Sequence, residues 1–213
     1  MVGRIWPRQG HCGQPLNSLV GRPRPRMGIF SKMFGSRVKT TADHPFVIAS
    51  PTIGFLNLKG AEGGRLLESD SSVLAPLFPG VANSTQAPPR CQVLFIYCDL
   101  DAAGAVPGGH GSVRDLIKAA GAYVAVVASE NAPEAYIKAM HVQNGWNANI
   151  ALVLDRRSDK FAQFFRRLFE AMFTGQSMLM AWVALAPQIP GRDDPNVPGT
   201  IMLAEAGHVV FGK

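Results

Sequence analysis

Three largely apolar runs in the second half of the chain predict strands that are buried on both faces. They are Val93–Tyr97, Ala122–Ala128 and Asn149–Leu154, and each is short and contains β-branched residues. Amphipathic helix patterns separate these runs and follow the last one. Strands that alternate with helices favour right-handed βαβ units. The pattern therefore predicts one three-layer α/β domain over residues 91–213, with an open, mainly parallel sheet and helices on both faces.

Two of the helices in this domain have clear sequence signals. Ser112, followed three residues later by Asp115, resembles a capping box, and Gly121 suits the left-handed position that ends a helix. Over residues 161–173, apolar side chains recur at the i, i+3 and i+4 positions, so this helix is expected to bury a stripe of phenylalanines. The remaining predicted elements are a helix capped by Asn131 that runs toward Met140, an apolar helix that ends at Ala186, and two terminal strands, Thr200–Leu203 and His208–Phe211.

The first 90 residues show weaker patterns. Residues 45–58 hold two short apolar runs, which predict a strand pair or two edge strands within the segment 43–90. Residues 59–90 mix glycine, serine and proline with small apolar residues, and we interpret them as a linker. Residues 1–42 are expected to be a basic, disordered extension. Its beginning suits a transit peptide, or residues 1–26 lie upstream of a start at Met27.

The positive charge of the chain is concentrated in its first 42 residues. The net charge is +6, from 21 basic and 15 acidic residues. Eight of the basic residues and none of the acidic ones lie within residues 1–42, which leaves 13 basic against 15 acidic groups in the remainder. A basic face for nucleic acid is therefore not expected in the α/β domain.

The cysteines and the apolar runs bear on the compartment. Cys12, Cys91 and Cys98 form no even-numbered disulfide framework, so a reducing, cytoplasmic location is expected. The longest unbroken apolar run, residues 178–187, is far shorter than the roughly 20 residues that span a bilayer. No transmembrane helix is therefore predicted.

Polar segments follow each of the three predicted strands. They are Cys98-Asp99-Leu100-Asp101, Ser129-Glu130-Asn131, and Asp155 with Ser158-Asp159. The carboxyl ends of parallel strands meet at one edge of a sheet, and open α/β sheets bind ligands there. We therefore expect the functional site of the domain at this edge.

The acids at this edge resemble the motifs of haloacid-dehalogenase-type phosphatases, with Asp-x-Asp, Ser and Asp-x-x-x-Asp after successive strands. The resemblance implies a phosphatase in which Asp99 is the nucleophile, Asp101 the general acid/base and Ser129 the phosphate ligand. Magnesium would then be the cofactor, held by Asp99, Asp101, Asp155 and Asp159, because a hard cation takes oxygen ligands. In the alternative interpretation, these side chains only cap helices and solvate loops.

A cysteine peptidase is a further hypothesis. His110 lies in the glycine-rich segment Gly108-Gly-His-Gly111 and could act as the base for Cys98 if the two loops converge. In the alternative, Cys98 is a half-buried thiol and His110 a turn residue. The other histidines have no metal-ligand spacing with one another or with cysteine, so zinc is not expected.

The segment Ser158–Trp182, followed by Gly199-Thr-Ile-Met-Leu-Ala204, resembles the end of a CHAT domain, the bacterial branch of the caspase-like fold. In that family an acid-capped amphipathic helix ends in glycine, a second helix follows, and a final strand closes the sheet. The resemblance covers residues 91–213 and implies a catalytic histidine after the first predicted strand and a catalytic cysteine after the second. This chain has Cys98-Asp99 and Ser129-Glu130-Asn131 there, so neither member of the dyad is retained.

The leading hypothesis is therefore a catalytically silent caspase-like domain that acts as an interaction or scaffold module for another protein. The fold class is either caspase-like or Rossmann-like, and no cofactor is predicted. A magnesium-dependent phosphatase that uses Asp99 and a cysteine peptidase that uses Cys98 are the alternatives. The sequence identifies neither the partner protein nor the oligomeric state.

Overall fold

The computed structural model describes residues 45–212 except residues 142–143, 158–159 and 187–193. The predicted basic extension, residues 1–42, lies outside the described residues. The strands are β1 (Phe46–Ala49), β2 (Ile53–Asn57), β3 (Val81–Ser84), β4 (Val93–Tyr97), β5 (Val124–Val127), β6 (Asn149–Asp155), β7 (Gly199–Ala204) and β8 (Val209–Gly212). The helices are α1 (Gly60–Leu74), the short 3₁₀ helix η2 (Ala75–Leu77), α2 (Val113–Ala120), α3 (Pro133–His141), α4 (Lys160–Phe173) and α5 (Met178–Leu185).

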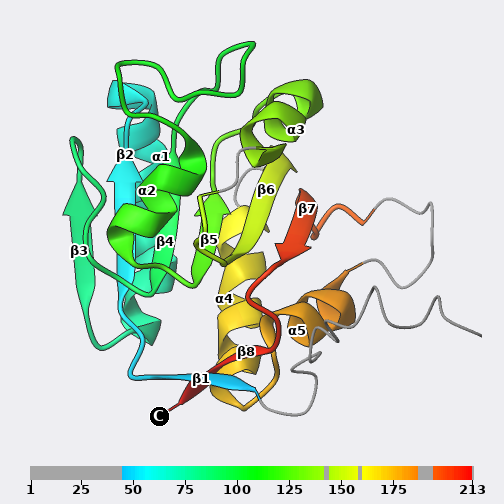
Figure 1. Cartoon of the computed structure of the whole chain (residues 1–213). Coiled ribbons are helices and arrows are strands. Elements are labelled where there is room, and N and C mark those ends of the chain that lie inside the picture. Colours follow the sequence, from blue (N-terminus) through cyan, green and yellow to red (C-terminus); the bar gives the residue numbers. More distant parts are fainter. Residues whose placement is uncertain (1–44, 142–143, 158–159, 187–193, 213) are drawn as a thin grey trace, which may run out of the picture. The chain divides into compact units, whose positions relative to one another are not determined.

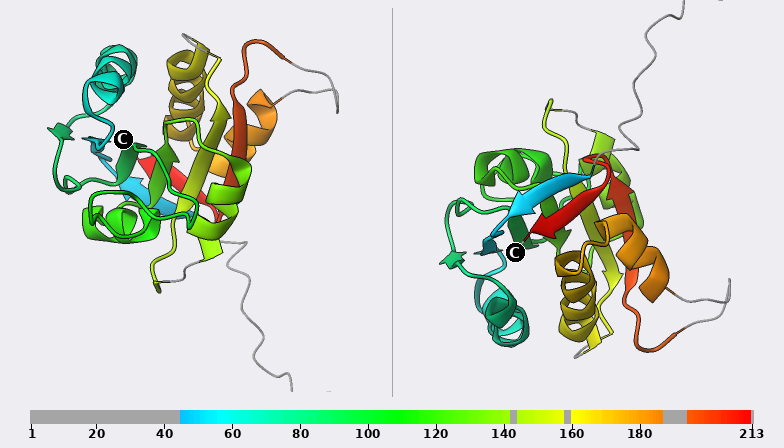
Figure 2. Two further views of the ribbon diagram at one scale, coloured as in Figure 1. Left: turned by 90° about the horizontal axis from the view of Figure 1, so that it is seen from above. Right: turned by 90° about the horizontal axis from the view of Figure 1, so that it is seen from below.

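Six of the strands form one sheet in the order β3-β2-β4-β5-β6-β7. Its first five strands run parallel, and β7 is antiparallel to β6 (Figure 1). Helices α1 and α4 cover one face of this sheet and α2 and α3 cover the other, as the two end-on views show (Figure 2). The predicted three-layer α/β fold with a mainly parallel sheet is thus confirmed.

Two hydrophobic clusters, one on each face of the sheet, form the core. Successive residues of β4 point to opposite faces. Accordingly Phe95 belongs to the cluster under α1 and α4, while Leu94 belongs to the cluster under α2 and α3. All five residues of β4 are buried, because β4 lies in the interior of the sheet and both of its faces are covered.

The two helices with the clearest sequence signals form as predicted. At the start of α2, Ser112 Oγ accepts a hydrogen bond from the amide of Asp115, and the Asp115 carboxylate accepts one from the amide of Ser112. Gly121 ends the helix with φ 73°, in the left-handed region. On α4, Phe173 is partly buried, and four other phenylalanines are fully buried: Phe161, Phe164, Phe165 and Phe169.

The prediction of a linker over residues 59–90 is wrong, because this segment contains α1, η2 and β3. Glycines and serines are poor helix formers, and α1 contains three of each. Contacts with the sheet compensate: a Cβ at Gly63 would lie 2.1 Å from Oδ1 of Asn57, so glycine permits the close approach of α1 to the end of β2. Asn57 also donates to the carbonyl of Gly60 and accepts from the amide of Lys59. Leu74, the last residue of α1, is fully buried in the hydrophobic core.

The upstream strands also differ from the prediction. The segment 45–58 was expected to give a strand pair or two edge strands, but β2 lies inside the main sheet between β3 and β4, and all five of its residues are buried. Instead of pairing with β2, β1 forms a separate parallel pair with the C-terminal β8. The α/β domain therefore includes β2 and α1, and its predicted boundary at residue 91 is wrong.

Among the helices that the structure describes, none is long and apolar enough to cross a membrane.

Candidate functional site

A small cavity opens at the carboxyl ends of the parallel strands, where the site was expected. Its volume is about 250 Å³. We call it the edge pocket, and its lining residues are Lys59, Glu62, Leu66, Ser129, Glu130 and Arg156. These residues come from the start of α1 and from the segments that follow β5 and β6. The pocket therefore lies where α1 meets the carboxyl ends of strands β5 and β6.

Ser129 is the buried hydroxyl of the edge pocket. It follows β5 by two residues and is 1% exposed. Its carbonyl accepts a hydrogen bond of 2.7 Å from the hydroxyl of Tyr136, which fixes the backbone. Its own Oγ has no hydrogen-bond partner among the described residues. A buried polar atom without a partner is costly and calls for an explanation, such as a ligand. No described group is placed to remove the Ser129 proton, so the hydroxyl is not activated as a nucleophile.

Arg156, a lining residue of the edge pocket, belongs to a buried ion pair. Arg156 Nη2 donates to both carboxylate oxygens of Asp70, at 2.8 and 2.9 Å, and Nη1 donates to the carbonyl of Ala128. The hydroxyl of Tyr97 donates to Asp70 at 2.8 Å. The guanidinium lies 3.8 Å from the ring centroid of Phe161, a cation–π geometry. This network joins α1, β4, the end of β5, the end of β6 and α4.

Sequence reasoning missed both members of this ion pair. Asp70 fell in the segment interpreted as a linker, and Arg156 follows the strand-end acid Asp155. A signal for Asp70 exists, because Leu66, Leu67, Asp70 and Leu74 follow the spacing of one helix face. An acid on such an apolar face predicts a buried partner.

Burial also changes the acidity of groups in this network. Burial raises the pKa of the Asp70 carboxyl above its usual value, although the Arg156 guanidinium and the Tyr97 hydroxyl oppose that effect. Burial and the neighbouring Asp70 carboxylate raise the pKa of Tyr97 well above its ordinary value. The Tyr97 hydroxyl therefore stays protonated at neutral pH and serves as a donor.

Asp99 and Asp101, the expected nucleophile and acid/base of a phosphatase, have separate partners. Asp99 Oδ1 lies 2.9 Å from the ammonium of Lys59, and its side chain is 58% exposed. Asp101 Oδ1 instead accepts hydrogen bonds from the amides of Ala103 and Ala105 in its own loop. Asp101 therefore stabilises a turn, and Asp99 is held by Lys59, a lining residue of the edge pocket.

The acids after β6 are likewise occupied or undescribed. Asp155 forms an ion pair with Arg157 and accepts a hydrogen bond from the Arg157 amide. Asp159 lies outside the described residues. Within the part of the chain that the structure describes, no three His, Cys, Asp or Glu side chains are placed to hold a metal ion. The magnesium-dependent phosphatase stays a prediction.

Cys98 and His110, the candidate peptidase pair, are not joined. Cys98 is fully buried, and burial together with the Asp99 charge raises the pKa of its thiol to about 12. The reactive thiolate is therefore scarce at neutral pH. His110 lies in the β4–α2 loop, and no hydrogen bond links it to Cys98 among the described residues. The side chain of Asn131 occupies that region: it accepts from the amide of Leu100 at 2.7 Å and donates to the carbonyl of Cys98.

Two exposed carboxylates, Glu62 and Glu130, line the edge pocket and form its acidic rim, and two cations, Lys59 and Arg156, line it as well. Lys59 is paired with Asp99 and with Glu62, and these two acids outweigh the opposing effect of burial and raise its pKa. Arg156 is paired with Asp70. The lining itself is therefore neutral in formal charge, and the two acids paired with its cations, Asp99 and Asp70, bring the cluster to 2 − 4 = −2.

The edge pocket thus combines a buried free hydroxyl, two paired cations and an acidic rim, a combination that can bind a polar group but offers no activated nucleophile. Glu130 is exposed, and Glu62 is 59% exposed, so both carboxylates can meet a ligand.

Comparison with known proteins assigns no relative, since no family model, no curated protein and no solved structure matches this chain.

Proposed function

We propose that this chain is a caspase-like, CHAT-like domain whose strand-end site is catalytically silent and binds a protein partner at the edge pocket. The sheet supports the proposal, because a run of parallel strands closed by one antiparallel strand resembles the arrangement of the caspase-like fold. The resemblance puts the catalytic histidine after β4 and the catalytic cysteine after β5, and these two strands pair directly. The loops that would carry the dyad are therefore neighbours.

The observation that carries the proposal is the state of Ser129. It stands after β5, where the resemblance implies the cysteine, and its hydroxyl has no partner among the described residues. A serine without a base does not attack a peptide bond at a useful rate. Cys98, after β4, is buried with a pKa of about 12, so it does not replace the missing thiolate.

The charge of the edge pocket supports a basic ligand. Both cations of the pocket are already paired. Glu62 pairs with Lys59 and Glu130 accepts from the amide of Arg156, yet both carboxylates stay exposed at the rim. A Lys or Arg side chain of a partner would complement this rim and could donate to Ser129 Oγ. The acidic rim repels phosphate groups, which disfavours nucleic acid at this site. The partner class we propose is a protein segment that presents a basic side chain.

A matched pair of peptide libraries tests this function. One library fixes a single arginine and the other fixes citrulline, its uncharged analogue, with the flanking positions randomised identically. We expect the chain to retain arginine peptides selectively, because only they complement the acidic rim. For a retained peptide, titration calorimetry of the Glu62→Gln, Glu130→Gln double variant should show at least about tenfold weaker binding, or about 1.4 kcal/mol.

The control is Glu134→Gln on α3, which removes an acidic side chain outside the edge pocket and should leave the affinity unchanged. Equal retention of the arginine and citrulline libraries would contradict the proposed ligand class. Equal weakening by the control would show that total charge, not the edge pocket, is responsible.

A further inference from the structure

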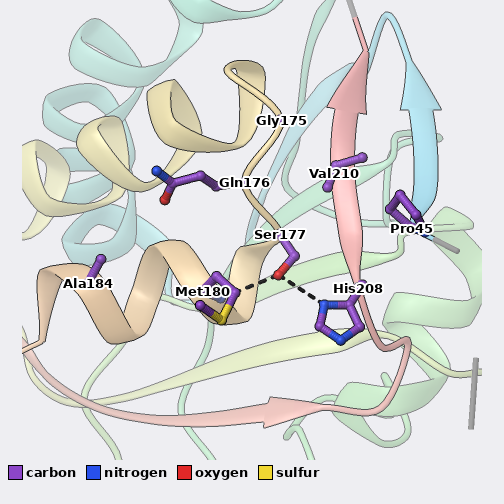
Figure 3. A pocket seen from close by; sticks show the side chains of 8 residues that line it. All are labelled: Pro45, Gly175, Gln176, Ser177, Met180, Ala184, His208 and Val210. Atoms are coloured by element: carbon purple, nitrogen blue, oxygen red, sulfur yellow. Dashed lines mark hydrogen bonds between the residues drawn. The ribbon is translucent and has the colours of Figure 1, made fainter. Parts of the chain in front are cut away.

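A second cavity, of about 600 Å³, is lined by residues next to β1, at the start of α5 and along β8 (Figure 3). Strands β1 and β8 lie at the amino-terminal ends of the parallel strands, opposite the end that carries the edge pocket (Figure 1). We call this second cavity the amino-end pocket. Its wall is mainly apolar, with Pro45, Met180, Ala184 and Val210, and it contains the polar side chains of Ser177 and His208. A cavity of this size with few convergent polar groups is typical of small-molecule sites.

Ser177 and His208 point toward each other in the amino-end pocket (Figure 3). Ser177 Oγ lies 3.3 Å from Nδ1 of His208. The same Oγ accepts a hydrogen bond of 3.4 Å from the amide of Met180 and so caps the start of α5. Since the Met180 amide is the donor in that bond, the serine keeps its own proton for His208. This requires the imidazole to carry its proton on Nε2 and to present Nδ1 as an acceptor.

We propose that Ser177 and His208 form a nucleophile–base pair that hydrolyses small carboxylic esters with an apolar acyl group. The pair supplies what Ser129 lacks, namely an imidazole within hydrogen-bond distance of the hydroxyl. The acyl chain would lie against the apolar wall of the pocket. This activity is independent of the function proposed for the edge pocket.

The reaction needs no group beyond the ester and water. Ser177 Oγ forms a bond to the ester carbonyl carbon while its proton passes to Nδ1 of His208. The bond from that carbon to the leaving oxygen then breaks, and His208 returns the proton to the departing alcohol. Water attacks the acyl-serine with His208 again as base, which releases the carboxylic acid and restores the Ser177 hydroxyl.

Active-site labelling of the full chain with a fluorophosphonate probe tests the pair. We expect one adduct per chain, mapped by peptide mass to Ser177, and slow hydrolysis of p-nitrophenyl butyrate. Ser177→Asn should abolish both, because asparagine retains the helix cap but is no nucleophile. His208→Asn should slow labelling at least about 100-fold, because its amide oxygen can still accept the serine hydrogen bond but cannot take the proton.

The control is Ser72→Ala on α1, which removes an exposed serine outside both pockets and should leave labelling of Ser177 unchanged. Circular dichroism checks that each variant is folded. Asparagine is chosen at both positions because it can preserve the local hydrogen bonds and so favours a folded variant. An unlabelled chain, an adduct on another residue, or a His208→Asn variant labelled at the original rate would overturn the proposal. In each of these cases Ser177 is a helix cap alone.

Discussion

Replacing Arg156 with methionine is expected to lower the free energy of unfolding by about 3–5 kcal/mol, because it leaves the buried charge of Asp70 without its partner. Asp70 is 2% exposed, and its two carboxylate oxygens accept from the same guanidinium. The Tyr97 hydroxyl alone cannot compensate for this loss. Since small domains unfold with about 5–15 kcal/mol, this variant should be close to unfolding.

Urea unfolding followed by circular dichroism measures this loss. The matched control is Arg166→Met, which breaks the exposed pair with Glu170 on α4 and should cost no more than about 0.5 kcal/mol. Adding Asp70→Asn to Arg156→Met should recover part of the stability, since it removes the unpaired charge. Equal effects of the two arginine variants would show that the Asp70–Arg156 pair does not stabilise the fold.

The second large effect is expected at Phe169, where alanine should cost about 3–5 kcal/mol through the cavity that it leaves. Phe169 is fully buried on α4. Its ring lies 6.1 Å from that of Phe95 in β4, 5.5 Å from Phe78 before β3, and 5.9 Å from Phe211 in β8. One side chain thus joins the main sheet to the β1–β8 pair.

The same urea titration checks the Phe169 prediction. Its control is Ile137→Ala on α3, where the side chain is 69% exposed, and we expect a change within about 0.5 kcal/mol. A Phe169→Ala variant as stable as the control would contradict the placement of α4 against both sheets.

The central strands and the helices α2 and α4 could be predicted from sequence because each has a strong local signal. Continuous apolar runs give β4, β5 and β6, the Ser112 capping box gives α2, and the phenylalanine stripe gives α4. Helix α1 has weak local signals, since its glycines disfavour a helix and its stability depends on contacts with β2 and on Asp70. Local propensity therefore predicted a linker where tertiary contacts form a helix.

In the candidate site too, some features follow from local sequence signals and others depend on tertiary contacts. Its position at the carboxyl ends of the strands, with Ser129 and Asp99, follows from the order of strands and polar segments. The Asp70–Arg156 pair joins residues 86 positions apart, and no local pattern links two such residues. Nor does sequence spacing indicate that Lys59 binds Asp99 or that Asn131 binds the loop after β4. These contacts depend on the packing of α1 and on the adjacency of β4 and β5.

Turnover of a mixed panel of peptide amides and phosphate esters, the latter with magnesium, tests most directly whether the strand ends are catalytically silent. The full chain is compared with a triple variant, Cys98→Ala, Asp99→Asn and Ser129→Ala, that removes every proposed nucleophile at that edge. Identical background rates are expected for the two proteins, because no group at the strand ends is an activated nucleophile. Turnover by the chain that the triple variant lacks would contradict this expectation, and the single variants would then identify the catalytic residue.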